Sequence, residues 1–121
     1  MENFRRFDAT DPYGRLWEVE FRWQQNAITI RHSDAVDAKF QLRQGDDITE
    51  KVIAVELPHL VTLSRKTGHG ITDGWVSRLA ALHLKEMIET DRDMEKTLVT
   101  ATLPDLERHS ARLDSAIATQ R

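Results

Sequence analysis

The sequence of 121 residues contains no cysteine. This absence excludes a disulfide scaffold, a thiol nucleophile and every zinc site built from thiolates, and it suits a reducing cytoplasm. An apolar stretch typical of a secretory signal is also missing, because Phe4, Arg5 and Arg6 lead into acidic residues. We therefore expect a cytoplasmic protein whose mature chain starts at Met1.

Long hydrophobic runs and an excess of positive charge are missing as well. The longest unbroken apolar runs, 52–55 and 79–82, are far shorter than the roughly 20 residues that a bilayer requires, so no membrane span is predicted. The chain has 17 Lys and Arg against 20 Asp and Glu, a net charge of -3. Because nucleic-acid binding depends on a local excess of positive charge, nucleic acid is not an expected partner.

The first half of the chain alternates between apolar and polar residues, as half-buried strands do. Alternation is strict over residues 15–24. The apolar side of this strand consists of Trp17, Val19, Phe21 and Trp23. A turn at Gln25 and Asn26 is predicted to return the chain into a second strand over residues 27–32.

Two more strands are predicted over residues 37–43 and 50–57, with a turn at 44–47 between them. The second of these is apolar enough to lie centrally in a sheet. Four consecutive strands without intervening helices indicate an antiparallel meander, because parallel neighbours need long crossover connections.

Helical spacing dominates the second half. Pro58 suits the first turn of a helix that Gly68 ends, although residues 61–63 could instead belong to an edge strand. Thr72 or Asp73 can then cap the helix with the strongest signal, which we expect to cover the aromatic side of the first strand. The apolar residues of this helix are Trp75, Val76, Leu79, Ala80, Leu82, His83, Met87 and Ile88.

The C-terminal part is predicted to contain a short strand over residues 97–103 and a last helix that Pro104 opens. The narrow apolar stripe of this helix consists of Leu106, Ser110, Leu113 and Ile117. No repeat or linker is visible. We therefore predict a single α+β domain over residues 1–121, with an N-terminal antiparallel β-meander of about four strands followed by two or three helices packed on one face.

One candidate site is the loop from Arg65 to Gly74, which directly precedes the strongest helix. Exposed backbone N–H groups at a helix N-terminus attract anions, and Lys66, His69 and Thr72 are the residues that would bind a small anionic ligand here. The glycine spacing is not that of a phosphate-binding motif. We favour the simpler interpretation, in which the glycines and Thr72 only end one helix and cap the next.

The second candidate is the pair His83 and Glu86, one helical turn apart, which can point the same way and share a divalent metal. A site needs further ligands, and the sequence does not show whether another of the five histidines reaches this pair. His83 lies on the apolar side of its helix, where a histidine is more often a core residue. We therefore predict no metal and no cofactor.

The remaining candidates have structural explanations. Asp8 and Asp11 could form an acid/base pair, but residues 11–14 are more simply a β-turn in a polar loop. The acids Asp91 and Asp93 lack the periodicity of a calcium loop. The aromatic row of the first strand could line a ligand pocket, and core packing is the favoured interpretation.

No catalytic residue is predicted. The favoured function is a small non-enzymatic interaction or regulatory domain that forms a homodimer through its C-terminal helix, although the stripe of that helix could equally pack within the chain. The alternative is a protein that binds a small ligand or anion at the Arg65 to Gly74 loop, with enzymatic activity left open.

Overall fold

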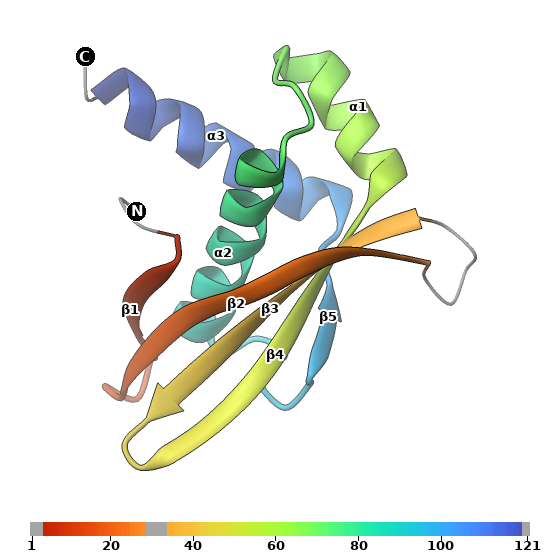
Figure 1. Cartoon of the computed structure of the whole chain (residues 1–121). Coiled ribbons are helices and arrows are strands. Elements are labelled where there is room, and N and C mark those ends of the chain that lie inside the picture. The colour runs from red at the N-terminus through yellow and green to blue at the C-terminus, as the bar shows by residue number, and fades with distance from the viewer. Residues whose placement is uncertain (1–3, 29–33, 120–121) are drawn as a thin grey trace.

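The protein folds into a sheet with helices on one side, as the computed structural model shows for residues 4–28 and 34–119 (Figure 1). The elements follow in the order β1 (Arg6–Thr10), β2 (Leu16–Ile28), β3 (Asp34–Gln44), β4 (Asp47–Glu56), α1 (Leu57–Thr67), α2 (Asp73–Thr90), β5 (Leu98–Thr100) and α3 (Leu103–Thr119). The predicted α+β class, with a meander followed by helices, is confirmed. Among the residues described, no helix is long and apolar enough to cross a membrane.

The sheet has five strands in the order β1-β2-β3-β4-β5. The first four are antiparallel, and β5 adds to the edge of β4 in parallel, with Ile53 opposite Val99. The predicted strand over residues 97–103 therefore exists in a shorter form. The predicted turn before β4 is also present, with Gly45 at φ 62°. Strand β4 has a neighbour on each side, as its apolar sequence predicts.

The second predicted strand is wrong as a separate element. There is no turn at Gln25 and Asn26, because both residues pair with β3, opposite Asp37 and Val36, and β2 continues to Ile28. Gln-Asn lacks the glycine that favours a tight hairpin turn. The rest of that predicted strand, residues 29–32, lies outside the described residues.

A β-bulge between Phe21 and Trp23 changes the face that the following residues present. Before the bulge, Val19 is buried and Phe21 is partly buried against the core. After it, Trp23 is 39% exposed on the opposite face, where the ammonium of Lys39 lies 5.5 Å from its ring centroid. The prediction that Trp23 shares the core face is therefore wrong, because one extra residue inverts the alternation.

The polar region before the first predicted strand, expected to be a loop, contains strand β1, so that expectation is wrong. Residues Phe7 and Ala9 are buried and pair with Val19 and Trp17 of β2. The predicted turn at residues 11–14 is present and joins the two strands. Its Gly14 has φ 81°, and the Gly14 N–H donates to the Asp11 carbonyl at 3.1 Å.

The helices begin and end where the local sequence predicts. Residues 61–63 lie within α1, which excludes the edge-strand alternative, and Gly68 ends this helix with φ 81°. Thr72 caps α2 by accepting a hydrogen bond from the Trp75 N–H at 3.2 Å. Lys51 then fixes the connection between α2 and β5, because its buried ammonium donates to the carbonyls of Met94 and Lys96.

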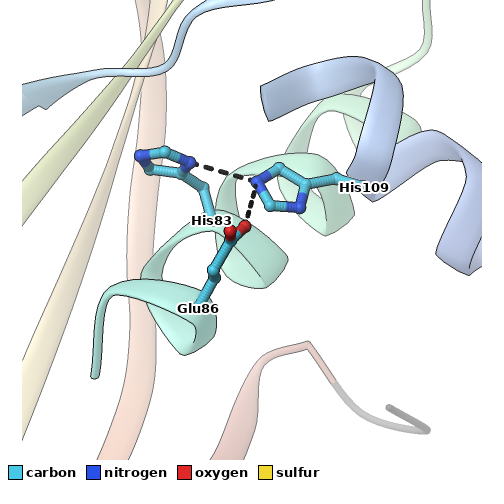
Figure 2. A group of neighbouring side chains, drawn as sticks. All are labelled: His83, Glu86 and His109. Atoms are coloured by element: carbon cyan, nitrogen blue, oxygen red, sulfur yellow. Dashed lines mark hydrogen bonds and ion pairs between the residues drawn. The ribbon is translucent and has the colours of Figure 1, made fainter. Parts of the chain in front are cut away.

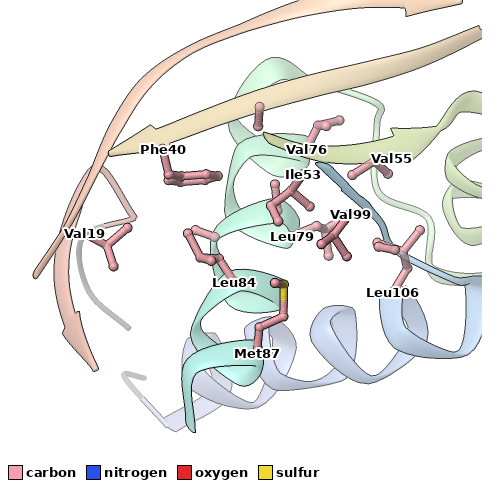
Figure 3. Packing of buried hydrophobic residues seen from close by; sticks show 14 of the residues in the cluster. Val19, Phe40, Ile53, Val55, Val76, Leu79, Leu84, Met87, Val99 and Leu106 are labelled. Atoms are coloured by element: carbon pink, nitrogen blue, oxygen red, sulfur yellow. The ribbon is translucent and has the colours of Figure 1, made fainter. Parts of the chain in front are cut away.

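The core lies between the sheet and α2, and α3 packs against α1 and α2 (Figures 1 and 3). Its labelled residues in Figure 3 are Val19, Phe40, Ile53, Val55, Val76, Leu79, Leu84, Met87, Val99 and Leu106. Each large apolar side chain buried in this way contributes about 1.5–3 kcal/mol. This packing fixes α2 and α3 beside each other, and the histidines of the two helices meet at their contact.

Candidate metal centre

Two buried histidines and a glutamate converge where α2 and α3 meet (Figure 2). His83 and Glu86 lie one turn apart on α2, and His109 comes from α3. His83 Nδ1 lies 3.1 Å from His109 Nε2, which in turn lies 3.4 Å from Glu86 Oε2. The three potential ligand atoms all lie within 4.8 Å of one another. The structure therefore supplies the third side chain that the sequence could not identify.

The position of His109 follows from the start of α3. Thr102 and Asp105 cap this helix reciprocally: the Asp105 N–H donates to Thr102 Oγ1, and the Thr102 N–H donates to Asp105 Oδ2. Leu106 is fully buried, and His109 follows it at helical spacing on the same face. The apolar contact of α3 therefore carries His109 into the interior.

Burial controls the charge of the two histidines. Burial and, to a smaller extent, the neighbouring His83 lower the pKa of His109, Glu86 acts in the opposite direction, and the resulting pKa is about 4. Burial also lowers the pKa of His83. Both imidazoles are consequently neutral at pH 7, the state in which histidine binds metals.

The hydrogen bonding of this group is incomplete without a further partner. The nearby carboxylate favours a proton on His109 Nε2, which His83 Nδ1 can then accept. Within the described part of the chain, no hydrogen-bond partner reaches His83 Nε2, His109 Nδ1 or Ser110 Oγ, although all three atoms are buried. Buried polar groups are normally satisfied, but His83 Nε2 and His109 Nδ1 are not the nitrogens that face Glu86, so an ion held between the three side chains would leave both without a partner.

A charged network surrounds the glutamate. Arg108 Nη2 donates to Glu86 Oε1 at 2.8 Å and to Asp105 Oδ1 at 2.5 Å. Burial alone would raise the pKa of Asp105, but hydrogen bonds from Arg92, Thr102 and Arg108 outweigh it and hold this pKa well below its usual range. Asp105 is therefore a permanent anion that anchors Arg108.

The residues predicted to bind an anion have partners within the chain. Lys66 pairs with Glu107 at 3.1 Å, and His69 Nε2 lies 2.8 Å from an oxygen of Asp114. Thr72 serves as the cap of α2. The predicted loop is shorter in the structure, because Lys66 lies in the last turn of α1, and the contacts of Lys66 and His69 join this segment to α3. Anion binding here stays a prediction.

The acidic candidates have structural roles. Asp11 accepts hydrogen bonds from the N–H groups of Tyr13 and Arg15 and from the side chains of Arg15 and Trp17. Burial raises the pKa of Asp11, but these hydrogen bonds outweigh it and lower the pKa to about 2. An acid this strong is a poor proton donor at pH 7. Asp91 accepts a hydrogen bond from the Tyr13 hydroxyl.

The sequence offers one indication that His109 is buried. His109 falls between Leu106 and Ser110 at helical spacing, on the same side as the apolar stripe. Its contact with His83, 26 positions away, depends on the docking of α3. Comparison with protein-family models, curated proteins and solved structures gives no match, so the function has to be argued from this geometry.

Proposed function

We propose that this chain is a non-enzymatic domain that binds one transition-metal ion through His83, Glu86 and His109. The observation that carries the proposal is the convergence of three ligand atoms from two helices within 4.8 Å of one another. Neutral imidazoles and an ionised carboxylate are the forms that bind metal, and burial favours the neutral form of both histidines.

The spacing of the donor atoms supports a small ion. Bonds of about 2.0–2.2 Å to four-coordinate zinc place neighbouring ligand atoms about 3.3 Å apart. Two of the three separations fit this value, with 3.1 Å between the histidine nitrogens and 3.4 Å between His109 Nε2 and Glu86 Oε2, and the third, between His83 and Glu86, is within 4.8 Å. Two nitrogens and one oxygen suit zinc and its neighbours in the first transition row, whereas magnesium and calcium prefer oxygen ligands.

The burial of the ligands supports a structural role for the ion. Both imidazoles are fully buried, and the Glu86 side chain is only 22% exposed. Three protein ligands leave a fourth position, as in catalytic zinc sites, but the burial of both imidazoles favours a closed, structural ion. Since the ligands come from α2 and α3, the ion would join the two helices and add its binding energy to the stability of the fold.

Metal titration of tag-free, chelator-treated protein tests the proposal. We expect one Zn²⁺ or Co²⁺ per chain and, at free metal about 100 times the Kd, a stabilisation of about 2.7 kcal/mol. His83→Gln and His109→Gln should abolish both, while the control His69→Gln, which alters a histidine on the 65–74 loop, should keep both. Wild-type protein that takes up no stoichiometric metal and shows no shift in melting temperature would refute the proposal.

A homodimer with an interaction or regulatory role is a second proposal. The packing of α3 within the chain weakens it. Leu106 and Ser110, which begin the predicted dimer stripe, are buried within the chain. A dimer through this helix would have to use the rest of its surface. Light scattering over a concentration series decides the matter, and a constant monomer mass would end the dimer proposal.

A further inference from the structure

We infer that Arg108 is a positioning residue that makes Glu86 a one-oxygen ligand and thereby restricts the site to small four-coordinate ions. This inference rests on the proposed metal binding at His83, Glu86 and His109, and it adds which ion the site selects and why. Its evidence is the separate network that joins Arg108 to Glu86 and Asp105.

Asp105 holds the guanidinium of Arg108 in place. Its Nη2 lies 2.5 Å from Asp105 Oδ1, and Asp105 is itself 4% exposed. The other oxygen of Asp105 accepts hydrogen bonds from Arg92 at 3.0 Å and from the Thr102 hydroxyl at 2.8 Å. Rotation of the Asp105 carboxylate would break several charge-assisted hydrogen bonds, so this carboxylate is fixed. The Arg108 guanidinium that it binds is held in place as well.

The same guanidinium nitrogen occupies one side of the glutamate. Glu86 Oε1 accepts from Arg108 at 2.8 Å, which leaves Oε2 as the oxygen that faces His109 at 3.4 Å. An ion bound here receives one oxygen and two nitrogens from the chain. Calcium commonly uses a bidentate carboxylate and six to eight oxygens, so a carboxylate with one oxygen already bound is a poor ligand for it.

Removal of Arg108 should change selectivity and coordination. With Oε1 released, Glu86 can bind through both oxygens and raise the coordination number. Larger ions such as Mn²⁺ then compete better with Zn²⁺. Outer residues that orient a metal ligand typically change affinity by about 10–100-fold, so we expect the preference for Zn²⁺ over Mn²⁺ to fall by at least about tenfold.

The test combines competition titration of Zn²⁺ against Mn²⁺ with the visible spectrum of the Co²⁺-loaded protein. Wild type and the matched control Arg112→Ala, an exposed arginine one turn further along α3, should give the intense bands of four-coordinate Co²⁺. Arg108→Ala should give the weaker bands of a higher coordination number, and Arg108→Lys should restore much of the original spectrum, because its ammonium group can still donate to Glu86.

Each outcome of this experiment is decisive. An Arg108→Ala protein with the spectrum and ion preference of wild type would overturn the role of Arg108 and leave the metal site standing. Wild-type protein that binds neither Co²⁺ nor Zn²⁺ would remove the metal site itself, and the inference with it. Should Arg108→Ala not fold, Arg108→Met carries the comparison, because it keeps the length of the side chain without its donors.

Discussion

The buried histidine pair makes a quantitative prediction about acid stability. His109 has a folded-state pKa of about 4, against 6.5 for an exposed histidine. As the pH falls below 6.5, His109 therefore binds a proton in the unfolded chain but stays neutral in the folded chain, and the free energy of unfolding falls. Between pH 7 and 4.5 this linkage removes about 2 kcal/mol of stability, and His83, whose pKa is lowered for the same reason, acts in the same direction.

Urea denaturation of chelator-treated protein at pH 7 and pH 4.5 measures this loss. The His109→Gln variant lacks the proton-binding group, so it should lose about 2 kcal/mol less than wild type over this interval. The chosen window lies above the usual pKa of aspartate, and acid titration of Asp11 and Asp105 contributes little to it. Equal losses in wild type and variant would show that His109 is not a buried neutral group, and would refute the reasoning.

Two smaller predictions concern the α2 cap and the bulge. Thr72→Ala should lower the free energy of unfolding by about 1 kcal/mol in urea denaturation, because the Trp75 N–H loses its acceptor, whereas Lys66→Ala, which breaks an exposed ion pair, should cost less than about 1 kcal/mol. Trp23→Phe should remove the indole fluorescence that acrylamide quenches most readily, since Trp75 is 8% exposed and Trp23 is 39% exposed. A cap variant as stable as wild type, or unchanged quenching, would contradict these expectations.

The sequence predicted the helix caps and turns, because each of these depends on only a few neighbouring residues. Thr72 as a cap, Gly68 as a helix end and the turn glycine Gly45 each act through a backbone conformation set by a few neighbours. The bulge at Trp23 could not be predicted in this way, because the sequence alternates smoothly through it. After the bulge, Gln24 accepts a hydrogen bond from Ser77 of α2, a contact between residues 53 positions apart in the sequence.

In the candidate metal site, too, the contact within one helix was predictable and the contact between helices was not. The pairing of His83 with Glu86 is a property of one helix and was visible as a two-ligand fragment. The arrival of His109 depends on how α3 packs against α2, which is set by buried residues such as Leu106. The sequence therefore favoured a core role for His83, and the burial is as predicted, but the helix contact adds a second histidine and a carboxylate to it.

The parallel docking of β5 has a consequence for the edge of the sheet. Strand β4 precedes α1 and α2 in the chain, and Leu98–Thr100 pair with the stretch Val52–Ala54 of its outer edge. An uncovered strand edge is a template for pairing with another chain. Strand β5 thus occupies part of this edge from within the chain, and it is followed within a few residues by the helix that carries His109.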